Sequence, residues 1–140
     1  MAEFYTALSA PEMAEQIANM LNTHNRLTTK HYGAGLVNAG GKYFVELERD
    51  KVIGCVGIVQ ETPNLTKVFH ACVLPEFRKH GIAKKLMRIA ISQCKTSHIY
   101  GTIRSDNEAS LSMVKGLGFI YVKKDWHKDH DVITVGRRLS

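Results

Sequence analysis

The sequence contains no long hydrophobic run: nowhere do about 18 apolar residues follow one another, so we expect no transmembrane helix and no membrane partner. The first residues lack the basic start and apolar core of a secretory signal, which predicts a cytoplasmic protein. Cysteine is scarce, with three residues: Cys55, Cys72 and Cys94. An odd number of cysteines, inside apolar segments and without metal-ligand spacing, predicts reduced core thiols and no metal site.

Length and composition favour one soluble domain. A chain of 140 residues, 44% apolar and 23% charged, suits a single compact domain that spans residues 1–140. The formal net charge is +6. This charge fits a basic surface for a polyanionic cofactor, and it also fits a nucleic-acid partner such as tRNA, although no specific nucleic-acid module is recognised.

The most informative segment joins an apolar strand, Val68–Leu74, to a helix that we expect from Gly81 to about Lys95. A turn that leads into a helix N-terminus leaves several backbone N–H groups unpaired, and the helix dipole adds partial positive charge there. The segment therefore predicts a site for a phosphate or pyrophosphate. Small residues at Gly81 and Ala83 would let an anion approach the backbone, and cationic side chains add full charge: Arg78, Lys79 and Lys84.

Two motifs carry a resemblance to a known family. The segment Arg78–Ala83 lacks both common phosphate-loop spacings, but it is similar to the Arg/Gln-x-x-Gly-x-Gly/Ala signature of the GNAT N-acetyltransferase superfamily. Residues Asn107–Phe119 resemble the family's Asn-led helix, which ends in Leu-Gly-Phe. The resemblance implies an α/β fold over the whole chain, with a central mixed, mostly antiparallel sheet flanked by helices.

The resemblance also implies acetyl-CoA as co-substrate and no metal. The pantetheine arm would pair with the backbone around Cys72 and bond to Asn107, while the turn after the strand would hold the pyrophosphate. The cofactor-binding residues implied in this way are Ala71, Cys72, Val73, Arg78, Lys79, His80, Gly81, Ile82, Ala83, Lys84 and Asn107. Structural roles remain open for each, such as a core residue for Val73 and a helix cap for Asn107.

The proton-transfer groups of the family are absent from their usual positions. Relatives commonly carry a Tyr on the Asn-led helix that protonates the leaving thiolate, and the residue at that position here is Val114. Many relatives also carry a Glu or His general base on the strand before the turn, and the residue at that position here is Lys67. The catalytic residues are therefore unknown from the sequence, with three substitutes to consider: His70, Glu46 and Tyr121.

Each substitute has its own difficulty. His70 lies on the strand before the turn, but simple alternation points it away from the face of Lys67 and Phe69 unless a bulge intervenes. Glu46 lies on one face of its strand with Glu48 and could reach the acceptor. Tyr121 is the phenol near the second motif. Each of these residues could equally be structural.

Alternation and turn residues predict the remaining elements. We expect strands at Phe4–Leu8, Lys42–Glu48, Val52–Val59, His98–Arg104, Phe119–Lys124 and Asp131–Arg138, a helix that begins at Ser9–Glu12, and a short helix at Leu27–Tyr32. In GNAT proteins the region between the first two strands, here around His24–Gly41, usually shapes the acceptor site.

Three hypotheses for function follow. The first is an N-acetyltransferase that moves the acetyl group of acetyl-CoA to an amine by direct attack on the thioester; the amine could belong to a small molecule, a protein or an aminoacyl-tRNA. The second is a coenzyme A-binding protein without catalysis, and the third is a nucleic-acid-binding interaction protein. Many relatives are dimers, so a homodimer is also considered.

Overall fold

The structure, a computed structural model, describes residues 10–24 and 41–139. The predicted strand Phe4–Leu8 and the predicted short helix Leu27–Tyr32 lie outside the described residues. The described elements are α1 (Ala10–His24), β1 (Lys42–Glu48), β2 (Lys51–Thr62), β3 (Leu65–Val73), the 3-10 turn η2 (Pro75–Phe77), α3 (Ile82–Gln93), β4 (His98–Arg104), α4 (Glu108–Gly116), β5 (Ile120–His127) and β6 (His130–Arg138). None of these helices is long and apolar enough to cross a membrane.

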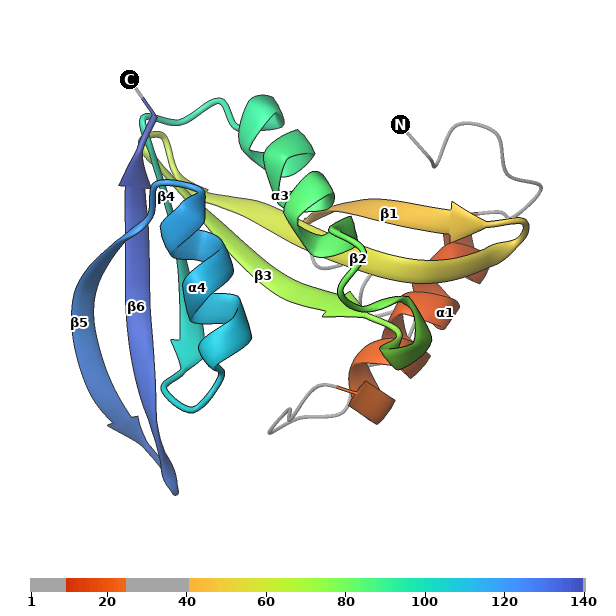
Figure 1. The fold of residues 1–140 in the computed structure, drawn as a ribbon. Helices are drawn as coiled ribbons and strands as arrows, with labels where there is room; N and C mark the ends of the chain where they lie inside the picture. The colour runs from red at the N-terminus through yellow and green to blue at the C-terminus, as the bar shows by residue number, and fades with distance from the viewer. Residues whose placement is uncertain (1–9, 25–40, 140) are drawn as a thin grey trace.

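The strands form one six-stranded sheet in the order β1-β2-β3-β4-β6-β5 (Figure 1). Among the described strands, β3 and β4 pair in parallel and every other neighbouring pair is antiparallel. The mixed, mostly antiparallel α/β architecture inferred from the sequence is therefore confirmed.

Helices cover the two faces of the sheet unequally. Helices α3 and α4 lie on one face, over a core cluster that includes Phe44, Leu86, Ile99 and Val114. Helix α1 covers the other face at β2 and β3 and presents an apolar stripe at helical spacing: Ala14, Ile17, Ala18 and Leu21. We call these two sides the α3/α4 face and the α1 face.

The strands β3 and β4 pair over three positions and then diverge, as Figure 1 shows. Their last ladder pair is Lys67 with Tyr100. A buried hydroxyl pair lies at the joined end: Thr66 Oγ1 is 2.7 Å from Thr96 Oγ1. Because the Thr96 hydroxyl donates to the carbonyl of His98 at 2.8 Å, the Thr66 hydroxyl is the donor to Thr96. The sheet is thus joined at one end of this strand pair and open at the other, next to the N-terminus of α3.

The closing hairpin is longer than the sequence pattern predicted. The ladder continues through Trp126 paired with Asp131 and His127 paired with His130, so two residues form the turn. The first of these, Lys128, has φ of 57°, the left-handed conformation that tight hairpin turns use. The sequence pattern had placed the strand ends at Lys124 and Asp131.

Candidate functional site

The turn between β3 and α3 presents unused backbone donors. Gly81 is the N-cap of α3 with φ of 77° and ψ of 12°, and no side chain caps this end. The first intrahelical bond runs from Lys85 N to Gly81 O at 3.0 Å, so the amides of the preceding helical residues have no acceptor within the helix. A Cβ at Gly81 would meet no atom within 4 Å, so the turn is open at this residue. The geometry suits an anion.

Cationic side chains surround the same turn. Arg78 is anchored at the end of β3, because its Nε donates to the carbonyl of Val73 at 2.9 Å. Lys79 and His80, also in the turn, are exposed, whereas Lys84 Nζ lies 3.8 Å from the place of a Cβ on Gly116, at the C-terminal end of α4. The turn therefore combines backbone donors with full positive charge, as the sequence predicted for a pyrophosphate.

The open edge of β3 leads from this turn into the gap between the strands. Cys72 and Val73 are buried and pair with β2 through Cys55 and Gly54, whereas Ala71 is exposed. No ladder pair joins β3 to β4 beyond Lys67 in the described sheet. Beyond that ladder, the edge at Cys72 and Val73 is a template for an extended chain that carries amide groups, such as a pantetheine arm.

A bulge in β3 interrupts the alternation of side chains. The register passes from Gly57 opposite Phe69 to Cys55 opposite Cys72. Two residues of β3, His70 and Ala71, are therefore opposite a single residue of β2, Val56. His70 has φ of 56°, a left-handed conformation that costs a residue other than glycine about 1–2 kcal/mol. The bulge provides the exception that the sequence argument required for His70.

The bulge brings His70 to the same face as two other rings. The ring centroids of His70 and Phe69 are 4.3 Å apart. The His70 ring stacks on Tyr43, with ring centroids 6.0 Å apart and 7° between the ring planes. The Tyr43 hydroxyl is 2.7 Å from Nδ1 of His70. Tyr43 packs on the cluster beneath α1, so this group lies on the α1 face.

Burial raises the pKa of Tyr43 well above its usual range, and the neighbouring Cys55 adds to that rise. The phenol therefore keeps its proton at neutral pH. It can donate that proton to Nδ1, or its oxygen can accept from an Nδ1–H, so one ring nitrogen is held in either tautomer. Only the tautomer whose Nδ1–H donates to the phenol oxygen leaves the Nε2 lone pair free, and in that tautomer the histidine has the chemistry of a general base.

Tyr43 was not among the candidate residues from the sequence, although a glycine in the neighbouring predicted strand could have indicated it. A Cβ at Gly57 would lie 2.9 Å from Tyr43 Cε1 and 3.0 Å from Phe69 Cε1, so only glycine leaves room for the two rings. Tyr43 and Phe69 are both opposite Gly57 in the ladder. An aromatic residue on each side of a strand glycine marks such a close approach.

The other candidates do not lie with His70. Glu46 accepts two hydrogen bonds from Lys85 Nζ, at 2.9 and 3.1 Å, and therefore faces α3. Tyr121 is 62% exposed on β5, which is three strands, or about 14 Å, from β3. Val114, at the usual Tyr position, is 5% exposed and belongs to the core. The structure thus brings together His70 and Tyr43, but neither Glu46 nor Tyr121.

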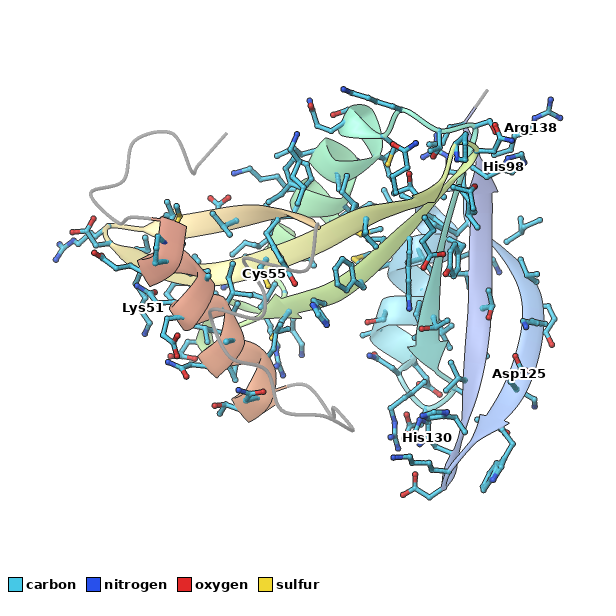
Figure 2. All side chains as sticks on the ribbon, turned by 180° about the vertical axis from the view of Figure 1, so that it is seen from behind. Lys51, Cys55, His98, Asp125, His130 and Arg138 are labelled. Atoms are coloured by element: carbon cyan, nitrogen blue, oxygen red, sulfur yellow. The ribbon has the colours of Figure 1, made fainter. Side chains whose placement is uncertain are left out.

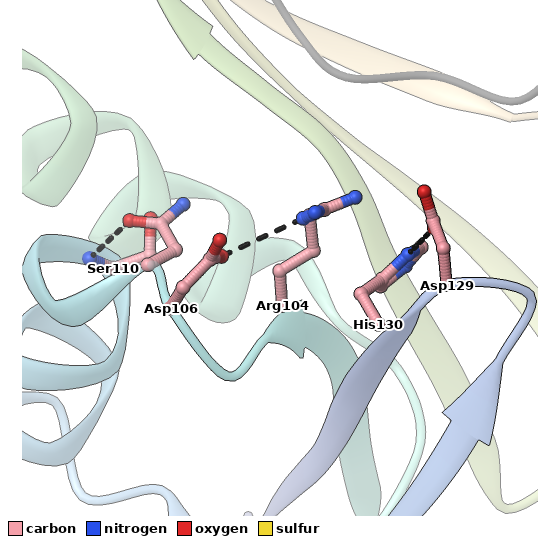
Figure 3. A network of polar contacts seen from close by, with 6 residues as sticks. Arg104, Asp106, Ser110, Asp129 and His130 are labelled. Atoms are coloured by element: carbon pink, nitrogen blue, oxygen red, sulfur yellow. Dashed lines mark hydrogen bonds and ion pairs between the residues drawn. The ribbon is translucent and has the colours of Figure 1, made fainter.

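A polar network lies at the end of β4, across the opening from the bulge (Figure 3). Arg104 Nε is shielded from solvent and makes no hydrogen bond. The guanidinium nevertheless forms an ion pair with Asp106, whose Oδ1 lies 3.5 Å from Nε. Asn107 caps α4, because its Oδ1 accepts from Ser110 N at 3.2 Å. On the hairpin, the hydrogen bond from His130 is the main cause that lowers the pKa of Asp129.

The fold separates this network from the rings on β1 and β3. Figure 2, seen from the α1 side, shows Cys55 on β2 and His130 at the distant hairpin. Within the described residues, no group of three or more His, Cys, Asp or Glu side chains could hold a metal ion.

Residues 4–119 match the model of the Acetyltransferase (GNAT) family, so this chain belongs to that family. N-alpha-acetyltransferase 30 of Saccharomyces cerevisiae is 41% identical to it over 51 residues, which span 34% of this chain and 29% of that protein. The chain therefore matches less than a third of that relative.

Solved structures share the fold at low identity. The yncA protein of Salmonella typhimurium, solved with its cofactor acetyl-CoA, has a TM-score of 0.80 at 16% identity, over 94% of this chain and 91% of that chain. A chain of the NatC complex bound to Gag peptide and CoA has a TM-score of 0.76 at 20% identity, over 92% of each chain. These likenesses concern the fold alone.

Proposed function

We propose that this protein is an N-acetyltransferase that moves the acetyl group of acetyl-CoA to an amine acceptor. The observation that carries the proposal is the pairing of an uncapped, glycine-led helix N-terminus with an open strand edge and a histidine on the α1 face. The amides around Ile82–Lys84, with Arg78, would hold the pyrophosphate. The edge of β3 around Ala71–Val73 would hold the pantetheine, and Asn107, beyond its role as a cap, would contact it.

The reaction needs little covalent assistance from the protein. The amine nitrogen forms a bond to the thioester carbonyl carbon, the carbon–sulfur bond breaks, and coenzyme A leaves as a thiolate. We assign the proton of the attacking amine to Nε2 of His70, in the tautomer whose Nδ1–H donates to the Tyr43 oxygen. Such general base help is worth about 10²–10⁴-fold, and the thiolate takes its proton from water.

We propose that the acceptor enters from the α1 face, where Tyr43, Phe69 and His70 lie together. A peptide or protein amine is the acceptor class that we favour. It is supported by the partial match to an N-alpha-acetyltransferase and by the fold shared with the peptide-bound NatC complex. A single-domain organisation, a cytoplasmic location and a homodimer remain predictions from the sequence.

Calorimetry on the purified full chain tests the cofactor assignment. Acetyl-CoA should bind with micromolar affinity, and adenosine 3′,5′-bisphosphate should bind more weakly because it lacks the pyrophosphate and pantetheine. Desulfo-coenzyme A should retain most of the affinity, because it keeps both of these parts. The acceptor is then sought among peptide N-termini, small amines and aminoacyl-tRNA by release of free coenzyme A thiol. Absence of acetyl-CoA binding at low salt would contradict the proposed function.

A further inference from the structure

Cys55 lies on β2 where the bulge interrupts β3. Its side chain is 0% exposed and belongs to the cluster beneath α1. The Sγ atom lies 3.2 Å from the carbonyl oxygen of His70, and the thiol donates a hydrogen bond to that oxygen. This bond links the neighbouring strand directly to the backbone of the left-handed residue.

The thiol is a permanent donor. Burial raises the pKa of Cys55 well above its usual range, and the nearby Cys72 adds to that rise. Cys55 therefore keeps its proton over the range in which an acetyltransferase would work. The same residue contributes to the raised pKa of Tyr43, so the thiol lies close to both members of the pair.

The backbone bond and the ring contacts act on one residue. The carbonyl of His70 is bonded to Cys55, and its imidazole is bonded to Tyr43 at 2.7 Å. A bulge disrupts the ladder locally, so a donor from the neighbouring strand at that position favours one backbone conformation over the alternatives. The direction of the imidazole depends on that conformation, because regular alternation would turn it to the other face.

We propose that Cys55 is a positioning residue for acyl transfer: its thiol holds His70 in the bulge that directs the imidazole to Tyr43 and the acceptor side. This inference rests on the proposed function, since that function gives His70 its role in acyl transfer. Cys55 itself touches no reacting atom in this scheme.

Four variants separate this role from simple core packing. Cys55→Ala removes the donor, Cys55→Val removes it while filling the space, and Cys55→Ser keeps a hydroxyl donor. Cys94→Ala is the matched control, because the Cys94 thiol also donates to a backbone carbonyl, that of Ala90 at 3.3 Å, but packs on the α3/α4 face away from His70. Amide spectra of α3 and α4 report whether each variant is folded.

Two readouts are needed, one of which is independent of turnover. The imidazole signals of His70, assigned with His70→Gln, should shift in Cys55→Ala and Cys55→Val and return towards wild type in Cys55→Ser. In the two variants without a donor, kcat should fall about tenfold, with the KM for acetyl-CoA changed less than about twofold. Cys94→Ala should leave the imidazole signals and kcat unchanged.

Unchanged His70 signals and kcat in folded Cys55→Ala or Cys55→Val would overturn the inference. A change of the same size in Cys94→Ala would overturn it too, since it would indicate a general effect of losing a packed thiol. If the wild-type protein neither binds acetyl-CoA nor transfers acetyl groups, the proposed function fails. The imidazole signals then still decide whether Cys55 fixes the ring.

Discussion

The hydroxyl of Tyr43 lies 2.7 Å from Nδ1 of His70, across an intervening strand and 27 residues away in sequence. Gly57 on that strand makes the contact possible, since any larger side chain would occupy the space of the rings. Under the proposed function, the pair would supply the proton-transfer group that the family's usual positions, Lys67 and Val114, do not offer.

The pair should act as a unit in catalysis. His70→Gln should lower kcat about 10²–10⁴-fold, because it removes the base, while acetyl-CoA affinity measured by calorimetry stays near wild type. Tyr43→Phe should lower kcat by about tenfold, and the double variant should be no worse than His70→Gln, because a partner has no effect once the base is gone. Independent, additive losses would argue against a shared role.

The left-handed backbone of His70 should cost stability. His70→Ala and His70→Gly both remove the ring contacts, but only glycine accepts φ of 56° without strain. The glycine variant should therefore be more stable than the alanine variant by about 1 kcal/mol in urea unfolding, with equal loss of activity. Equal stability of the two variants would mean that the bulge relaxes when the imidazole is removed.

The turn at Gly81 should discriminate by charge. Gly81→Glu should weaken acetyl-CoA binding more than about 100-fold, since it places a carboxylate before amides that receive a pyrophosphate. Gly81→Ala is the control, because it carries the same backbone strain at φ of 77° without the charge. Both variants should lose about 1–2 kcal/mol of stability. Calorimetry and thermal melting measure the two effects, and undiminished affinity in the glutamate variant would remove the turn from the cofactor site.

Tyr100 should make the fold sensitive to alkali. Burial, followed by the hydrogen bond to Glu61 at 2.5 Å and the charge of Glu61, raises its pKa from 10 to about 12. Between these values the folded chain holds a proton that the unfolded chain has lost, so stability is present below pH 10 and falls as pH rises above it. In urea unfolding between about pH 8 and 11, Tyr100→Phe should show a shallower fall than wild type. Tyr43, whose pKa is also raised, contributes in the same direction.

The parts of the site that are local in sequence could be predicted. The turn from Arg78 to Lys84 and the Asn107 cap depend on neighbouring residues, and turn and capping rules apply at that range. The mixed sheet followed from the same patterns together with the family resemblance.

The parts that depend on contacts between strands could not be predicted. Period-two alternation cannot reveal a bulge, and without the bulge His70 points to the wrong face. The bond to Tyr43 depends on the register of three strands around Gly57. Likewise, the ion pair between Glu46 and Lys85 depends on how α3 packs over the sheet, and the strand pattern does not predict that packing.

The short ladder between β3 and β4 divides the sheet into two halves, β1-β2-β3 and β4-β6-β5. Each half has its own long antiparallel ladders, whereas the described ladder between the halves has three residue pairs, supplemented by the Thr66–Thr96 and Tyr100–Glu61 hydrogen bonds. Under the proposed function, acetyl-CoA lies in the opening and contacts both halves, so its binding free energy adds to the cohesion of the sheet itself. The two halves of the sheet are then held together more strongly when acetyl-CoA is bound. In each turnover, release of coenzyme A lowers this stability, and binding of the next acetyl-CoA restores it.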